Sequence, residues 1–195
     1  MNIKYILLAG GASSRFGPFN DKSKVLFRLM GEPVIARTLK GLEEVGAEKA
    51  VVVVPPGMEL TELSRGLKMK PERIVQLRPD GQANAIMTAF GGMNNTENIV
   101  VVNAQHFTAS EVIPKMIDLY KKTRKSVILS IKTDEPERYG IIGFKGDKVT
   151  QVIEKPAASD APSDLRVVGI YLLTPEVLSI IKSLPLSQYQ LEAGL

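Results

Sequence analysis

Residues 6–17 have the sequence ILLAGGASSRFG, in which a short apolar run passes directly into a glycine-rich turn. Two similar apolar runs, rich in β-branched residues, follow at residues 51–54 and 99–102. Because none of the three alternates between apolar and polar residues, they are typical of strands buried on both faces of a parallel sheet. Helical patterns at residues 34–45 and 83–90 lie between the runs. This alternation predicts an α/β fold of the Rossmann-like, doubly wound kind, whose ligands usually bind beyond the carboxyl ends of the strands.

A different pattern begins after residue 125. Two strand-like runs at residues 140–144 and 148–153 are separated by a Gly-Asp pair that suits a tight hairpin turn. Strand character returns at residues 166–173, before a Thr-Pro pair that suits the start of a helix. We therefore expect a mixed, mostly parallel sheet with a strand-rich C-terminal lobe. Since no repeat or linker divides the sequence, a single domain over residues 1–195 is predicted.

The composition excludes several classes of protein. The 195 residues are 44% hydrophobic and 24% charged, close to the average of soluble globular domains and unlike a disordered chain or a membrane protein. The sequence has no cysteine, which excludes a disulfide scaffold, a zinc ribbon and a cysteine nucleophile and suits the cytoplasmic location that we expect. The single histidine, His106, excludes a multi-histidine metal site.

The charge and the hydropathy of the sequence indicate which classes of partner the protein can bind. The net charge of +4 is small for a protein that binds nucleic acid. The densest basic run, residues 121–125, follows a helical pattern, and cations are favoured at the C-terminal end of a helix. No segment approaches the roughly 20 apolar residues of a membrane span. We therefore expect neither a nucleic-acid nor a membrane partner, and the sequence leaves the oligomeric state open, a homo-oligomer included.

The turn after the first apolar run is suited to an anion. Gly10 and Gly11 allow backbone N–H groups to approach a phosphate, and Arg15 adds a planar guanidinium that can bind two phosphate oxygens. The turn is not a P-loop, since the Lys-Ser/Thr pair is missing, and its glycine spacing differs from the dinucleotide fingerprint. Taken alone, it is equally compatible with an ordinary strand-to-loop turn.

A second segment makes the pattern specific. Residues 8–15 are followed by Lys24-Val25-Leu26, by Gly31 and by Pro33. In combination these residues resemble the signature of the sugar-1-phosphate nucleotidyltransferases, enzymes of sugar nucleotide biosynthesis that join a nucleoside triphosphate to a sugar-1-phosphate and release pyrophosphate. The molybdenum-cofactor and methylerythritol cytidylyltransferases are related to them and have nearly the same N-terminal motif. The sequence departs from the pattern at Ser23, where the family usually has proline.

The resemblance implies roles for the residues of the nucleotide half. In the family, a glycine loop and two catalytic cations hold the triphosphate, and a Gln followed by a Gly contacts the base. By resemblance, the loop and the base-contacting residues are Ala9, Gly10, Gly11, Gln76 and Gly81, and the two cations are Arg15 and Lys24.

Later segments extend the resemblance over nearly the whole chain. Tyr139-Gly140 on one predicted strand and Glu154-Lys155 after the next match the family's sugar-site pattern, and they separate this chain from the related cytidylyltransferases. The resemblance implies that Glu154 binds sugar hydroxyls and that Lys155 is a third catalytic cation, bound to the sugar phosphate. It also implies that Tyr139, Gly140 and Gly169 contribute to the sugar site. We expect the whole site to lie across the carboxyl ends of the first, third and fourth parallel strands.

The metal site is where the sequence departs furthest from the family. The family uses Mg²⁺, which carboxylates normally hold beside the phosphates. After the run at residues 99–102 the family usually has Gly-Asp, with the Asp on the metal, whereas this chain has the neutral Gln105 at that position. A second metal ligand of the family would follow Leu195, so we expect the chain to be short at its C-terminus.

Two interpretations of that departure stay open. The chain is either an active transferase, whose Mg²⁺ is held mainly by the triphosphate with Gln105 or His106 nearby, or a non-catalytic relative. Such a relative would bind a nucleotide or a sugar phosphate as a regulatory or assembly subunit. The transferase reaction needs no general base, because its nucleophile is a phosphate oxygen that is already ionised near neutral pH. A single histidine is therefore no obstacle to activity.

Overall fold

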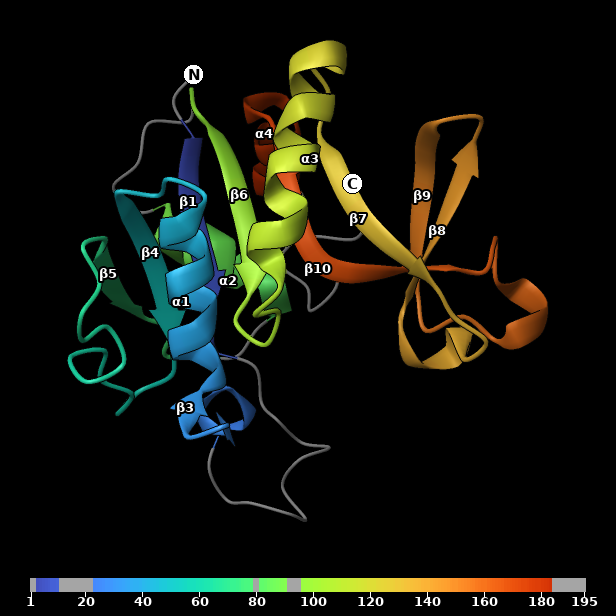
Figure 1. The fold of residues 1–195 in the computed structure, drawn as a ribbon. Coiled ribbons are helices and arrows are strands. Elements are labelled where there is room, and N and C mark those ends of the chain that lie inside the picture. The colour runs from blue at the N-terminus through green and yellow to red at the C-terminus, as the bar shows by residue number, and fades with distance from the viewer. Residues whose placement is uncertain (1–2, 11–22, 79–80, 91–95, 184–195) are drawn as a thin grey trace.

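A mixed β-sheet with helices on both faces forms the larger part of the structure (Figure 1). The computed structural model describes residues 3–10, 23–78, 81–90 and 96–183. The 8 strands of the main sheet are β1 (Ile3–Leu8), β4 (Lys49–Val54), β5 (Lys70–Val75), β6 (Asn98–Asn103), β7 (Val127–Lys132), β8 (Gly140–Lys145), β9 (Lys148–Glu154) and β10 (Leu165–Leu173). A small antiparallel pair consists of β2 (Arg28–Leu29) and β3 (Glu32–Pro33).

The helices connect these strands. The α-helices are α1 (Val34–Glu44), α2 (Gly81–Ala89), α3 (Ala109–Thr123) and α4 (Pro175–Ser183), and short 3-10 helices are η1 (Lys24–Leu26), η2 (Pro136–Arg138) and η3 (Ala158–Asp160). The main sheet has the order β5-β4-β1-β6-β10-β8-β9, and β7 also pairs with β10. Its first four strands in this order are parallel, and β10, β8 and β9 are antiparallel to their neighbours.

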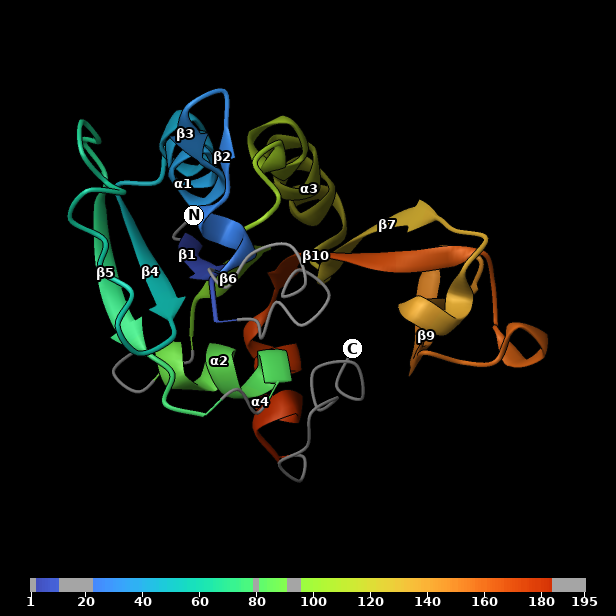
Figure 2. The ribbon, with the colours of Figure 1, turned by 90° about the horizontal axis from the view of Figure 1, so that it is seen from below.

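The three inner parallel strands, β1, β4 and β6, are buried on both faces, as their unbroken apolar runs predict. Leu7 of β1 lies in register with Val52 of β4 on one side and with Val102 of β6 on the other. Because successive side chains of a strand point to opposite faces, Leu7 and Val52 belong to the core under α1 and α3. Ile6 and Val51 belong to the core under α2 and α4. Figure 2 shows these two helix pairs on opposite faces of the sheet, which confirms the doubly wound α/β fold.

The C-terminal lobe is also confirmed. The antiparallel hairpin of β8 and β9 turns at Gly146 and Asp147, and it lies to one side of the main sheet with η2 and η3 (Figure 1). Strand β10 belongs to both parts. Its C-terminal half pairs with β6, while Arg166 lies in register with Ile131 of β7 and with Ile141 of β8. The lobe is therefore an extension of the same sheet.

Two strands of the main sheet, and the small pair β2–β3, are not predicted by the sequence patterns. Strand β5 has the sequence KPERIV and lies at the edge of the sheet, where among the described strands it pairs with β4 alone and needs no continuous apolar run. Strand β7 becomes exposed towards its end at Lys132, where it leaves the core for the lobe. Helix α2 begins at Gly81 rather than at residue 83.

The basic run of the sequence lies at a helix end, as its pattern predicts. Lys121 and Lys122 occupy the last turn of α3, and Arg124 follows in the left-handed conformation with φ of 58°. Within the described ranges, no helix combines the length and the apolar character that crossing a membrane requires.

Leucine-to-alanine substitutions in two helices test the assigned core. Leu39 of α1 is fully buried, whereas Leu119 of α3 is 48% exposed. We expect Leu39→Ala to lower the free energy of unfolding by about 2–5 kcal/mol, because it removes buried methyl groups and leaves a cavity. The matched control Leu119→Ala should change it by about 0.5 kcal/mol or less. Denaturant unfolding measures both variants, and equal losses would contradict the assigned core.

Candidate active site

The residues that follow β1, β5 and β6 lie at one edge of the sheet, where the carboxyl ends of its parallel strands meet (Figure 2). Main-chain hydrogen bonds extend the sheet pairing into these residues. The N–H groups of Ala9 and Gln76 donate to carbonyls of β4, and that of Ala104 donates to a carbonyl of β1, at 2.8–2.9 Å. Backbone that is paired in this way holds the attached side chains and glycines in fixed positions.

Gln76 and Gly10 pack against each other at this edge. The Gln76 residue is 6% exposed, and its Nε2 donates to Asn84 Oδ1 at 2.8 Å and, more weakly, to Gly81 O at 3.5 Å. A Cβ atom on residue 10 would lie 2.8 Å from Gln76 Oε1, so a side chain there would displace the Gln76 amide from its present position. The structure thus brings Gly10 of the predicted triphosphate loop together with Gln76 and Gly81, the two residues predicted to contact the base.

Asn84 of α2 belongs to this cluster but is not predicted from the sequence. It lies in a helix whose other residues facing the sheet are apolar, among them the buried Ala83 and Ile86. A partly buried polar residue in such a helix gives no signal in the sequence until its partner is known. The hydrogen bond from Gln76 supplies that partner and orients the Gln76 amide.

The segment after β6 lies in the middle of the sheet edge. The hydroxyl of Thr38, a fully buried residue of α1, donates to Ala104 O at 2.8 Å and ties this segment to the helix. The Nε2 atom of Gln105 lies 3.4 Å from the Nε2 atom of His106. Both side chains are half-buried. Gln105, the predicted metal position, therefore points its amide at an imidazole.

His106 is close to cations from both parts of the structure. Burial lowers the pKa of its imidazole below the ordinary value of 6.5, and the positive charges of Lys24 and Arg166 lower this pKa further. A hydrogen bond with the Val168 backbone opposes these effects. The neutral imidazole is therefore favoured. It lies within electrostatic reach of Lys24 in η1, next to the buried Val25, and of Arg166 in β10.

The predicted sugar-site residues come together at the base of the β8–β9 hairpin. Gly140 lies opposite Glu154, and a Cβ atom on Gly140 would lie 3.0 Å from Glu154 Oε2 and 2.7 Å from Val167 Cγ2. The Lys155 N–H donates to Tyr139 O at 2.9 Å, and Lys155 Nζ lies 3.5 Å from Glu154 Oε1. The Glu154 side chain is 18% exposed and that of Lys155 is 45% exposed. Val167 and the Glu154 carboxylate thus pack so closely on Gly140 that a side chain would not fit there, and the Lys155 ammonium lies beside that carboxylate.

Gly169 lies where β10 bends between the main sheet and the lobe. Its φ of +93° is a conformation that side chains rarely adopt, and a Cβ atom on it would overlap the amide of Asn103 at the end of β6. The register of β10 with β7 also shifts between Val167 and Tyr171. The structure therefore places Gly169 at the joint beside the sugar-site residues, in contact with the last residue of β6.

The predicted residues thus form two groups along one edge. One group surrounds Gln76 at the carboxyl ends of β1 and β5, and the other surrounds Glu154 in the lobe. Gln105 and His106 follow β6, which lies between β1 and β10 in the sheet. Gly11 and Arg15 lie outside the described residues.

Magnesium does not fit the part of the site that the structure describes. Within the described ranges, no three His, Asp or Glu side chains gather as a metal cluster. Gln105 offers one neutral amide next to an imidazole, whereas Mg²⁺ prefers six oxygen ligands with carboxylates or phosphates among them. We therefore derive no step through a metal that the described side chains hold.

Comparison with known proteins decides the family. The sequence profile of a family described as nucleotidyl transferase matches residues 4–193. The chain belongs to this family. The membership confirms the resemblance to the sugar-1-phosphate nucleotidyltransferases and the enzyme class, nucleotidyltransferase.

Relatives and solved structures agree with the family. This nucleotidyl transferase is 27% identical to the UTP–glucose-1-phosphate uridylyltransferase of Streptococcus pneumoniae over 217 residues, which cover 92% of this chain and 73% of that protein. A UDP-glucose pyrophosphorylase from Acinetobacter baumanii has the same fold, with a TM-score of 0.80 at 19% identity over 98% of this chain and 80% of that one. A UDP-glucose pyrophosphorylase complexed with UDP-glucose gives a TM-score of 0.76 at 23% identity, over 94% of this chain and 80% of that one.

Substitution of Gly169 tests the joint between the two parts. We expect Gly169→Ala to lower the free energy of unfolding by about 2 kcal/mol or more, because a side chain there is strained and also overlaps the Asn103 amide. The matched control is Gly66→Ala, since Gly66 has φ of +83° with no atom within 4 Å of the added Cβ, and it should show the backbone strain alone. Denaturant unfolding measures both losses.

A double-mutant cycle separates the two contributions to the Gly169 effect. In an Asn103→Ala background the overlap is gone, so Gly169→Ala should cost about as much as Gly66→Ala. An undiminished loss in that background would show that Asn103 does not pack on Gly169.

Proposed function

We propose that this nucleotidyl transferase joins a nucleoside triphosphate to a sugar-1-phosphate and releases pyrophosphate. The observation that carries this function is the placement of two polar groups on one edge of a continuous sheet, around Gln76 and around Glu154, with His106 between them. A nucleotide and a sugar phosphate bound to these groups would meet near the end of β6. The printed names of the relatives, uridylyltransferases and UDP-glucose pyrophosphorylases, support the same reaction.

The group around Gln76 suits the nucleoside. An amide that is buried and oriented by Asn84 presents a fixed pattern of donors and acceptors, which is what the edge of a base requires. Gly10 lets the chain pass close to that amide, and Gly11 and Arg15 follow it in the sequence. Lys24 and Arg15 would stabilise the negative charge of the pyrophosphate as it leaves.

The group around Glu154 suits the sugar phosphate. A largely buried carboxylate accepts hydrogen bonds from neighbouring hydroxyls, and the missing side chain of Gly140 lets that carboxylate pack directly against β8. Lys155 would offset the repulsion between the acceptor phosphate and the α-phosphate that it attacks. Tyr139 and Gly169 complete the proposed sugar site, Tyr139 beside the Lys155 backbone and Gly169 at the bend of β10.

The chemistry then consists of positioning and charge neutralisation. The acceptor phosphate is ionised near neutral pH and attacks the α-phosphate directly, so no side chain has to remove a proton. Holding the two anions in line removes most of the entropic cost of their encounter. We include Mg²⁺ in the proposal as the counter-ion that the triphosphate carries, and the described side chains are given no metal step.

A second candidate function follows from Gln105. Where the family usually places the carboxylate that holds the metal, this chain has a neutral amide directed at His106. A relative that had lost catalysis would keep the nucleotide and sugar-phosphate groups and bind these molecules without joining them. Binding and turnover therefore have to be measured on the same protein.

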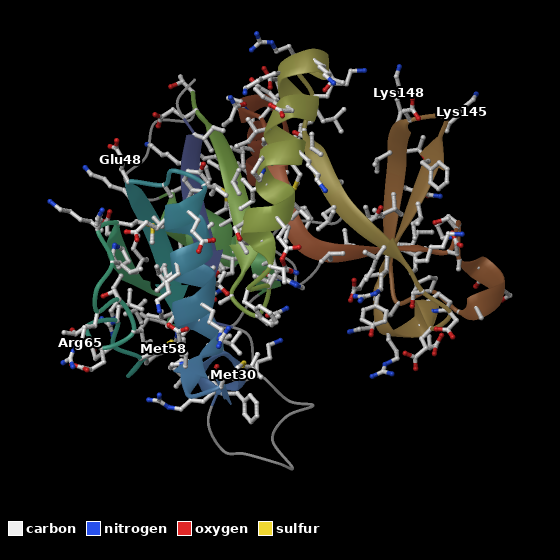
Figure 3. The ribbon with its side chains drawn as sticks, in the orientation of Figure 1. Met30, Glu48, Met58, Arg65, Lys145 and Lys148 are labelled. Atoms are coloured by element: carbon white, nitrogen blue, oxygen red, sulfur yellow. The ribbon has the colours of Figure 1, made fainter. Side chains whose placement is uncertain are left out.

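Pyrophosphate release separates the two candidates. We expect the protein to release pyrophosphate when given Mg²⁺, a set of nucleoside triphosphates and a set of hexose-1-phosphates, and only when both substrates are present. Lys155→Met should lower kcat/KM by about 100-fold or more, because it removes a charge beside the reacting phosphates. Lys148→Met is the matched control, since Lys148 lies at the exposed tip of the hairpin, away from its base (Figure 3).

The outcomes of this assay differ for each candidate. Triphosphate binding by calorimetry without pyrophosphate release from any substrate pair would exclude the transferase and leave the binding relative. Equal losses in Lys155→Met and Lys148→Met would contradict the sugar-phosphate role of Lys155.

A further inference from the structure

Arg166 is the one arginine of β10, and a tyrosine ring holds it in place. Its guanidinium carbon lies 4.1 Å from the centre of the Tyr139 ring, which places the planar cation over the face of the ring. Arg166 is half-buried, and its backbone is held in the sheet opposite Ile141 and Ile131. The guanidinium is thus preorganised by aromatic stacking and by strand pairing.

No carboxylate among the described residues pairs with Arg166. The ion pairs of the structure engage several other arginines, for example Arg73 with Glu59 at 3.1 Å and Arg138 with Glu135 at 2.6 Å. Arg166 shares no ion pair and no side-chain hydrogen bond in the described ranges. A guanidinium has five N–H donors, and stacking on a ring leaves these donors at its edge available to an acceptor.

The surroundings of Arg166 point to an anion rather than to a solvated surface. Its charge acts on His106, on which Lys24 acts as well, and the residue next to His106 is the neutral Gln105. The positive charges of Lys24 and Arg166 thus reach one imidazole from separate parts of the structure. Positive charge supplied to one place from two parts of a structure favours a bound anion there.

We infer that Arg166 binds the phosphate of the sugar-1-phosphate, an assignment that rests on the proposed function. Arg166 lies on the lobe side, over Tyr139, whose carbonyl accepts the Lys155 N–H, so it belongs with the sugar-phosphate group rather than with the triphosphate group. A planar guanidinium can bind two oxygens of one phosphate, which an ammonium such as that of Lys155 cannot do in a fixed geometry.

Binding without metal tests this role directly. The probe is the hexose-1-phosphate that supports the fastest pyrophosphate release by the wild-type protein, titrated by calorimetry in the presence of EDTA. We expect Arg166→Met to weaken its binding at least about tenfold, because a charged hydrogen-bond donor is lost. Arg166→Lys should recover part of the affinity, since it restores the charge but not the planar pair of donors. Nucleoside triphosphate binding should change by less than about twofold.

Arg124→Met is the matched control. Arg124 also lies beside a tyrosine ring, 5.9 Å from the centre of Tyr120, but at the C-terminal end of α3. The variant should leave both affinities unchanged. A structural role of Arg166 would instead lower both affinities together, or lower the free energy of unfolding without selectively changing sugar-phosphate binding.

The outcomes separate this inference from the proposed function. Equal sugar-phosphate affinity in the wild type and in Arg166→Met overturns the role of Arg166 and leaves the transferase proposal intact. A loss of triphosphate or pyrophosphate binding with unchanged sugar-phosphate binding also overturns it, by moving Arg166 to the other substrate. If no hexose-1-phosphate supports pyrophosphate release and none binds to the wild-type protein, the proposed function fails and the inference fails with it.

Discussion

The antiparallel pairing of β10 with β6 is the interaction on which the rest of the structure depends. Ile170 lies opposite Val102 and Leu173 opposite Ile99, all in strand segments that are buried. Towards its N-terminal end, before the bend at Gly169, the same strand pairs with β7 and β8. One strand thus extends the parallel half of the sheet and begins the lobe, so the lobe lies beside the carboxyl end of β6 without a separate docking interface.

The shared strand β10 determines which residues meet at the candidate active site. The bend at Gly169, against Asn103, brings Arg166 and the base of the hairpin towards His106. The hydroxyl of Thr38 also fixes the segment after β6, because it donates a hydrogen bond to Ala104 O. Charges from the two parts therefore meet at an edge with no metal cluster among its described residues, and phosphate anions are the ligands that this arrangement suits best.

The sequence predicts the parallel core well, because strands buried on both faces must be unbroken apolar runs. It also predicts the hairpin turn and the grouping of Gly140 with Glu154, since short turns and a motif of adjacent residues are local features. It does not predict β5, whose charged edge needs no apolar run, or the partnership of Asn84 with Gln76. Nor does it predict a role for Arg166. That role depends on Tyr139 and His106, which are distant from Arg166 in the sequence and come beside it only in the folded chain.

We propose that one continuous edge of the sheet, from Gln76 to Glu154, binds both substrates. The most direct measurement is a crystal structure with the nucleotide sugar that the protein itself forms. We expect the base to lie against Gln76 and Gly10 and the sugar to lie against Gly140 and Glu154. The phosphates should lie between them, near His106. A nucleotide sugar bound elsewhere, or one with its sugar directed away from the hairpin, would contradict the account.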